Sequence, residues 1–378
     1  MTMKIIFVLF TCFIYEASTI QLPSSCPDLP FHDIPTDHLF HKKVKPLVIA
    51  HRGLPKEYQE NTYDGIIASL DSHADGFELD IYKTKDDQLV VFHDDNTMRM
   101  TGVSKVVYNS TYQELLELNI TDTIVKGGNT YTFGKKRKIP LLEDILKVTS
   151  KHDILHYLEM KPSEPLRPHE LQLAKDTARL VAQIIEKMGL VKKAIIVSFD
   201  FRKVKVVKAI NPNITVGTLF SQKFADKPKS RYLEMKELGN LEQCVKDGPE
   251  DTLEFFKFVL QSGLFFKQAG SSSFDCDIKL YNNPKYLNKT LPTLRQNYSR
   301  TVSTGFYTIY SMGKTEEQHL IDERKALQLI KQGGGQRFIT DDVKRARSLL
   351  GKSSSAGTIL KMNSFIICLN FFVFQFHF

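Results

Sequence analysis

Histidine, carboxylate and basic side chains recur where short apolar runs of the sequence end. Seven such residues follow or close the runs 47–50, 76–82, 89–92 and 155–159: His51, Arg52, Glu78, Asp80, His93, Glu159 and Lys161. Glu78 and Asp80 are two residues apart, so on a strand both carboxylates project from one face. Glu159 and Lys161 have the same spacing. The pattern predicts that these side chains meet at one edge of a sheet.

The residue types in this set suit metal-assisted cleavage of a phosphodiester. Three carboxylates without cysteine suit a hard cation such as Mg²⁺ or Ca²⁺. Arginine and lysine beside a cation suit a phosphate, whose spread charge needs several positive donors. Two imidazoles can remove a proton from an attacking oxygen and deliver one to a leaving alkoxide. Each residue alone has an ordinary structural explanation, and only their joint placement favours catalysis.

The elements that must position this set alternate between strand-like and helix-like segments. Expected strands cover residues 46–50, 76–82, 89–92, 155–159, 194–198, 215–220, 305–309 and 338–340, with a less regular candidate near 274–280. Helical periodicity covers 63–69, with Asn61 or Thr62 as the cap, and 170–188. The alternation predicts a parallel α/β sheet. Residues 95–138 do not fit it and are interpreted as an excursion, whose basic run 135–138 is most simply a solvated loop.

In order along the chain, the motifs resemble those of the glycerophosphodiester phosphodiesterase family. They are His51-Arg52-Gly53, Glu60-Asn61-Thr62, Glu78-x-Asp80, His93-Asp94 and Glu159-x-Lys161, with weaker matches at Ser198-Phe199, Phe306–Ile309 and Ile339-Thr340-Asp341. The resemblance covers about residues 46–345. It implies a TIM (β/α)₈ barrel with a small insertion after the second strand, which accounts for 95–138. The barrel domain is expected to span about 40–350.

The same resemblance implies a role for each member of the set. His51 and His93 correspond to the acid/base pair, and Arg52 and Lys161 to the groups that hold the phosphate. Asn61 corresponds to a supporting position. The three metal ligands correspond to Glu78, Asp80 and Glu159, which makes a divalent cation, Mg²⁺ or Ca²⁺, the implied cofactor. Tyr307 stands where the family often has tryptophan, so the head group packed there is left open.

Three functions remain from this stage. The first is hydrolysis of glycerophosphodiesters to an alcohol and glycerol phosphate. The second is a lysophospholipase D or sphingomyelinase D-type activity on lipid, because the spider-venom phospholipase D enzymes resemble the same family. The third is a non-catalytic binding protein on the same barrel. The net charge of +8 favours anionic partners, but no nucleic-acid motif accompanies it. The oligomeric state is left open.

Both ends of the sequence carry processing signals. Lys4 and the apolar run 5–15, followed by small residues to Thr19, predict a signal peptide over 1–19. Five glycosylation sequons agree with a secreted or cell-surface protein: Asn109, Asn119, Asn213, Asn288 and Asn297. Residues 353–378 combine small residues, a short spacer and an apolar tail, the layout of a GPI-anchor signal that would attach the protein to a membrane surface. Cys26, Cys244 and Cys276 then allow one disulfide, with Cys244–Cys276 weakly favoured.

Overall fold

The computed structural model describes residues 29–162, 168–221, 262–280, 302–331 and 335–351. The predicted signal peptide, the C-terminal tail, Cys26, Cys244, Asn288 and Asn297 lie outside these ranges. Cys276 is a buried free thiol among the described residues. The other three sequons, at Asn109, Asn119 and Asn213, are exposed. In the described residues no helix is both long and apolar enough to cross a membrane.

Eight parallel strands close into a barrel, as the resemblance to the family implies. They are β1 (Leu47–Ala50), β2 (Gly76–Lys83), β6 (Leu155–Met160), β7 (Ala194–Ser198), β8 (Thr215–Phe220), β9 (Ser273–Asp277), β10 (Ser303–Ile309) and β11 (Arg337–Thr340). Neighbours pair in that order, and β1 pairs with both β11 and β2, which closes the ring. The irregular candidate near 274–280 is therefore a barrel strand, and it ends at Asp277.

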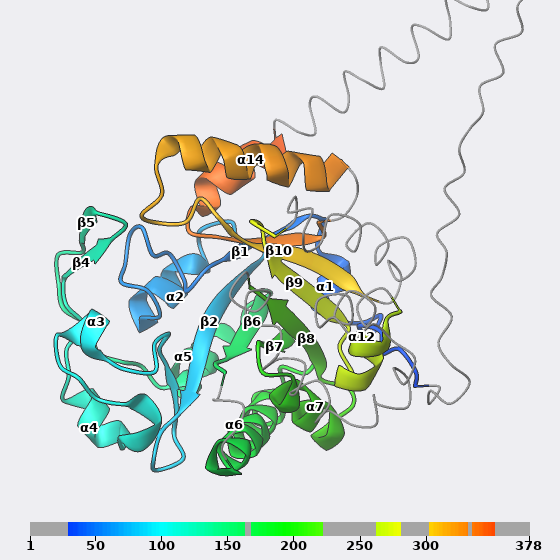
Figure 1. Ribbon diagram of the computed structural model, residues 1–378, viewed down its shortest axis with the longest axis horizontal. Coiled ribbons are helices and arrows are strands. Elements are labelled where there is room, and N and C mark those ends of the chain that lie inside the picture. Colours follow the sequence, from blue (N-terminus) through cyan, green and yellow to red (C-terminus); the bar gives the residue numbers. More distant parts are fainter. Residues whose placement is uncertain (1–28, 163–167, 222–261, 281–301, 332–334, 352–378) are drawn as a thin grey trace, which may run out of the picture.

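Helices cover the outside of the barrel (Figure 1). They are α2 (Tyr63–Ser69), α5 (Leu142–Thr149), α6 (Pro168–Lys187), α7 (Phe201–Ile210), α12 (Leu264–Ala269) and α14 (Glu316–Lys331). Thr62 is the N-cap of α2, and its hydroxyl accepts a hydrogen bond from the Gly65 amide. Alternate strand residues face two separate cores. Outward ones, such as Val48 and Leu79, pack against the helices, whereas inward ones, such as Ile49 and Val197, fill the barrel.

A short N-terminal segment packs against the residues that fill the barrel. Helix α1 (Leu39–Lys42) contributes Leu39 and Phe40 to the inner core. The Leu39 amide donates to the carbonyl of Lys192, and the His38 ring bonds the carbonyl of Ala194. Lys192 and Ala194 precede and begin β7, so this contact covers the amino-terminal end of the strands. The opposite, carboxyl-terminal end is left for the site, as in other barrels of this kind.

The insertion after β2 forms a small layer of its own. It contains β3 (Leu89–Val91), α3 (Met98–Thr101), a 3₁₀ turn at Val107–Asn109, α4 (Tyr112–Leu116) and the hairpin of β4 (Thr123–Lys126) and β5 (Asn129–Thr132). Its apolar residues, among them Val90, Phe92 and Ile124, form a separate core. β3 runs antiparallel to β2, so it is not a member of the parallel ring.

The basic run 135–138 does more than the solvated loop expected of it. Lys135 and Arg137 both pair with Asp64 of α2, at 2.8 and 2.9 Å. Arg137 also donates to the side chain of Gln59 and lies over the ring of Tyr58. The run therefore fastens the insertion to the helix that follows β1.

Candidate active site

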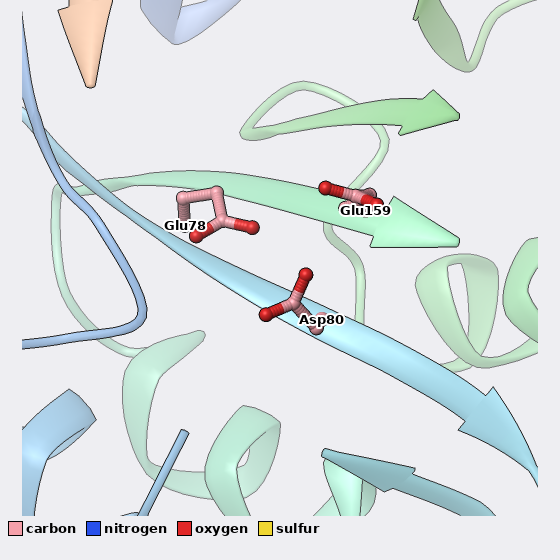
Figure 2. A group of neighbouring side chains, drawn as sticks. All are labelled: Glu78, Asp80 and Glu159. Atoms are coloured by element: carbon pink, nitrogen blue, oxygen red, sulfur yellow. The ribbon is translucent and has the colours of Figure 1, made fainter. Parts of the chain in front are cut away.

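Three carboxylates converge at the carboxyl ends of β2 and β6. These strands are neighbours, and Asp80 pairs with Glu159 in their register. Glu78, Asp80 and Glu159 point toward a common space (Figure 2), and each offers an oxygen within 4.8 Å of the others. All three are buried. The i, i+2 spacing of Glu78 and Asp80 produces this arrangement, because both side chains leave the same face of β2.

The chemistry of this triplet fits a hard divalent cation. Burial and the charges of Asp80 and Glu159 raise the pKa of Glu78 well above its ordinary value. Burial also raises the pKa of Glu159. Oxygen Oε1 of Glu159 is buried and accepts no hydrogen bond of good geometry, although Lys161 Nζ lies 2.7 Å away. Three oxygen donors whose repulsion disfavours full ionisation would gain most from a cation between them.

Two cations and an amide hold Asp80 in place behind this triplet. Lys161 Nζ lies 3.1 Å from Oδ1 of Asp80, and Arg52 Nε lies 3.2 Å from Oδ2. Asn61 donates its side-chain amide to Oδ2 at 2.7 Å and accepts from the Asp80 backbone at 3.1 Å. Burial alone would raise the pKa of Asp80, but Lys161 and Arg52 outweigh it and keep the pKa below the ordinary value. Asp80 is therefore ionised.

The turn after β1 brings Arg52 to the triplet. Arg52 has a φ of 56° and Gly53 a φ of 87°. A Cβ on Gly53 would lie 2.6 Å from the carbonyl carbon of Gly65, so only glycine lets the turn pass this close to α2. The turn directs the Arg52 amide to Oε2 of Glu78, at 2.9 Å. One tight turn thus positions both the backbone and the side chain of Arg52.

His51 enters the site from the end of β1, where Asp341 orients it. Oδ1 of Asp341 lies 2.5 Å from Nδ1 of His51, and Nε2 of His51 is 4.0 Å from Oε2 of Glu78. The carboxylate fixes Nδ1 as the protonated nitrogen, so Nε2 presents its lone pair to the site. Burial lowers the pKa of His51, and Asp341 only partly opposes this.

His93 reaches the site by a different path from the one expected. It follows antiparallel β3, whose end returns to the level of Asp80, since the Phe92 amide bonds the Asp80 carbonyl. Nδ1 of His93 lies 2.6 Å from Oδ1 of Asp94, so Nε2 is again the free nitrogen. Burial, followed by the charges of Lys161 and Arg52, lowers the pKa of His93 to about 4.

Residues to which the sequence gave no role complete the site. Arg99 of α3 forms ion pairs with Glu60 and with Asp94, both at 2.6 Å. It therefore connects the carboxylate that holds Arg52 with the carboxylate that orients His93. Glu60 in turn pairs with Arg52 at 2.8 Å. Three of these supporting residues could have been found from the sequence, because they lie within the family motifs: Glu60, Asp94 and Asp341. Arg99 lies inside the insertion, where no motif marks it.

A cleft of about 600 Å³ opens over these groups. Six of the eight predicted site residues line it: His51, Arg52, Glu78, His93, Glu159 and Lys161. Asp80 and Asn61 lie buried just behind. Phe199, Leu219 and Tyr307 form part of an apolar wall. Tyr307 donates its hydroxyl to the Phe220 carbonyl at 2.5 Å, which leaves its ring edge-on to Phe199. The structure thus brings all eight predicted residues to one end of the barrel.

A TIM barrel whose cleft contains two oriented histidines and a carboxylate triplet has the groups that a phosphoric diester hydrolase needs. Residues 51–256 match the sequence pattern described as the glycerophosphoryl diester phosphodiesterase family, and the chain belongs to this family. That span starts at His51 and includes every residue of the predicted site.

Individual relatives are similar to parts of the chain. The glycerophosphodiester phosphodiesterase of Caldanaerobacter subterraneus is 32% identical over 178 residues, which are 47% of this chain and 68% of that protein. The human lysophospholipase D GDPD1 is 36% identical over 100 residues, 26% of this chain and 32% of that protein. The chain thus matches about two thirds or less of these relatives' length.

Solved structures share the fold at low sequence identity. A putative enzyme of this family from Silicibacter pomeroyi is 16% identical and has a TM-score of 0.59, covering 84% of this chain and 98% of its own. An Oleispira antarctica phosphodiesterase, solved with sn-glycerol-3-phosphate, is 18% identical with a TM-score of 0.55, covering 81% and 97%. These structures share the barrel fold over a larger part of this chain than the sequence matches cover.

Proposed function

We propose that this protein hydrolyses glycerophosphodiesters to glycerol phosphate and an alcohol, and that a divalent cation is required. The observation that carries the proposal is the pairing of two imidazoles, each with Nδ1 held by a carboxylate, in the same cleft as a carboxylate triplet. A binding protein would not need two histidines oriented in this way. Family membership agrees with this reaction.

Glu78, Asp80 and Glu159 are the residues that would hold the cation. A bound Mg²⁺ or Ca²⁺ would supply Lewis-acid stabilisation of negative charge on the phosphate oxygens. Arg52 and Lys161 line the cleft beside the triplet and can donate to the same oxygens. Both are also paired with Asp80, so their positions are fixed before substrate binds. Such preorganisation lowers the reorganisation needed in the transition state.

His51 and His93 divide the two proton transfers. One accepts the proton of the attacking oxygen at Nε2, and the other gives a proton from Nε2 to the leaving alkoxide. Burial lowers the pKa of both, so both are neutral at pH 7 in the free protein. An anionic phosphate between them favours the protonated form of an adjacent imidazole. Substrate binding therefore helps to supply the acid that the reaction needs.

A second candidate is cleavage of lysophospholipids by the same machinery. The apolar wall of Phe199, Leu219 and Tyr307 could accept an acyl chain next to the charged half of the cleft. Two of the relatives carry the name lysophospholipase D, from mouse and human. A water-soluble diester would have no apolar group to contact that wall. A lysophospholipid is therefore included among the substrates to be tested.

A product assay on the purified protein decides between these functions. Glycerophosphocholine and lysophosphatidylcholine are supplied in turn, with Mg²⁺ or Ca²⁺ and with chelator, and the phosphate-containing product is identified by mass spectrometry. We expect faster turnover of glycerophosphocholine, and its loss in chelator and in Glu78→Gln. Faster release of lysophosphatidic acid would favour the second candidate. Turnover of neither substrate would favour the non-catalytic binding protein, and full turnover in chelator would exclude the metal.

We also propose that the protein is secreted or held at the cell surface, through the signal peptide at 1–19 and a GPI anchor at the C-terminus. The exposure of Asn109, Asn119 and Asn213 supports glycosylation at these positions. The intact mass of protein from the medium of expressing cells should show a start near Thr19 and attached glycans. Release of the protein from cells by a phosphatidylinositol-specific phospholipase C tests the anchor.

A further inference from the structure

The hairpin of β4 and β5 in the insertion is docked against the loop that follows β10. Gly127 and Gly313 are packed backbone to backbone, because a Cβ on Gly127 would lie 2.1 Å from the Gly313 carbonyl oxygen. The Gly313 amide also donates to the Tyr131 hydroxyl at 3.0 Å. Both glycines have positive φ, 58° and 82°. The barrel and the insertion thus hold the hairpin in a defined place at the mouth of the cleft.

Lys126, at the end of β4, lines the cleft together with His51 and Glu78. It lies two residues after buried Ile124, so both side chains leave the same face of β4. The positive charge of Lys126 lowers the pKa values of His51, Asp341 and Glu60, although burial and nearer charges have larger effects on each. The charge of Lys126 therefore influences the groups on the His51 side of the cleft.

Lys126 differs from three other cations that line the cleft, Arg52, Lys161 and Arg99, because each of those three is paired with carboxylates. Arg52 pairs with Glu60 and Asp80, Lys161 with Asp80 and Glu159, and Arg99 with Glu60 and Asp94. In the part of the chain that the structure describes, the ammonium of Lys126, a partly buried residue, makes neither a hydrogen bond nor an ion pair; the same holds for Lys279, which also lines the cleft but is exposed. A partly buried cation without a counterion is available to pair with an anion that binds beside it, and such a charge-assisted hydrogen bond is stronger than a neutral one.

We propose that Lys126 binds a second anionic group of the substrate, and that the enzyme prefers diesters whose head group carries a negative charge in addition to the scissile phosphate. Arg52 and Lys161 lie beside the carboxylate triplet and would hold the scissile phosphate, together with the cation that the triplet would bind. Lys126 comes from the insertion rather than from a barrel strand, so it meets the part of the substrate that extends past His51. This inference rests on the proposed function and adds the class of head group to it.

The test compares two substrates that differ by one charged group, glycerophosphoinositol and glycerophosphoinositol 4-phosphate. We expect Lys126→Gln to lower kcat/KM for the phosphorylated compound by about 10- to 100-fold, the usual range for losing a charged hydrogen bond. The loss should lie in KM, because Lys126 does not touch the reacting atoms. The loss of kcat/KM on glycerophosphoinositol should be much smaller, so the ratio of the two losses measures the contribution of the second anionic group. Lys126→Arg should retain the preference, and Lys126→Glu should reverse it.

Lys136→Gln is the matched control, since Lys136 is an exposed lysine of the same insertion that does not line the cleft. An equal loss on both substrates would assign Lys126 to the scissile phosphate and overturn the proposal, and so would no loss on either. Calorimetric affinities of both compounds, measured with and without Lys126→Gln on a His93→Ala background, repeat the comparison without turnover. If wild type cleaves neither these two compounds nor glycerophosphocholine, the proposed function fails, while these affinities still decide the role of Lys126.

Discussion

The barrel contains two buried groups of charges that differ in balance and in access. The floor group consists of Arg337 on β11 and Asp275 on β9, both fully buried, with Nη2 of Arg337 2.7 Å from Oδ2 of Asp275. Ser273, Ser303 and the Tyr157 hydroxyl complete it through hydrogen bonds. The mouth group consists of the charged residues that line the cleft and the carboxylates that support them. Its carboxylates are Glu60, Glu78, Asp80, Asp94, Glu159 and Asp341, and its cations are Arg52, Arg99, Lys126, Lys161 and Lys279. There the carboxylates outnumber the cations, and a cleft of about 600 Å³ opens over them.

This difference separates a structural charge cluster from a reactive one. On the floor, one cation meets one anion, and even Gly305 leaves no space, since a Cβ there would lie 2.0 Å from Oδ1 of Asp275. At the mouth, burial and repulsion raise the pKa values of Glu78 and Glu159. Unbalanced charge in an accessible pocket is what binds a cation and a phosphate, whereas a balanced pair without access can only hold strands together.

The largest expected effect is loss of turnover at the mouth without loss of fold. His51→Ala and His93→Ala should each lower the rate by about 10²–10⁴, the usual contribution of one acid or base. Each removes a side chain of the cleft and leaves the carboxylate triplet intact, so calorimetric binding of Mg²⁺ or Ca²⁺ should persist. Rates on glycerophosphocholine, together with thermal unfolding, measure both properties. A variant that turns over near the wild-type rate would show that its histidine is structural.

Breaking the floor group should cost a free energy of similar size, but it should lower the stability of the fold and not the rate of turnover. Arg337→Met leaves Asp275 buried without a counterion, which should cost about 3–5 kcal/mol of unfolding free energy. Adding Asp275→Asn to Arg337→Met removes both charges and should recover part of that loss, as a double-mutant cycle of these two substitutions in urea would show. Turnover per folded molecule should remain close to wild type. Strictly additive losses would mean that the pair is not coupled.

The sequence predicted the mouth better than the floor, and the reason is local spacing. Glu78-x-Asp80 and Glu159-x-Lys161 place their side chains by strand geometry. Seven of the eight site residues could therefore be predicted at the ends of apolar runs, and the eighth, Asn61, came only from the resemblance to the family. Asp275 and Arg337 lie far apart in the chain, and each looks like an ordinary strand residue. Only the order of the strands in the sheet, with β10 pairing with both β9 and β11, brings them together. The pairing of Arg99 with Glu60 likewise depends on how the insertion folds back.

Two strands, β9 and β3, were difficult to place in the sheet from the sequence, because their apolar patterns were weak or too short. β9 was hard to predict because its sequence Ser273–Asp277 carries inward polar residues in place of an apolar alternation. Those polar residues are the floor group, which explains the missing signal. The antiparallel direction of β3 follows from the short turn after β2, yet a run of three apolar residues does not reveal direction. Patterns therefore fail where a residue's partner is remote in sequence.

The smallest predicted effect concerns His156, a buried histidine on the outer face of β6 that belongs to neither charge group. Its ring bonds the Thr149 hydroxyl at 2.9 Å and the Ile154 carbonyl at 3.1 Å, and burial lowers its pKa to about 3. The unfolded chain, with an ordinary pKa near 6.5, binds this proton more readily than the folded one. The stability linked to His156 is therefore fully present above about pH 6.5 and is lost as the pH falls.

At pH 5 the linked loss amounts to about 2 kcal/mol of unfolding free energy. His156→Gln should unfold more easily at pH 7, yet its stability should fall less between pH 7 and pH 5 than that of wild type. His38, whose pKa burial lowers to about 4, titrates in the same direction and remains in the variant. Some pH dependence should therefore persist. Urea titrations at both pH values measure the difference, and parallel curves for variant and wild type would show that His156 is already solvated in the folded protein. A reduced slope would show instead that a single neutral imidazole, remote from the cleft, contributes to the acid sensitivity of the barrel independently of the catalytic pair.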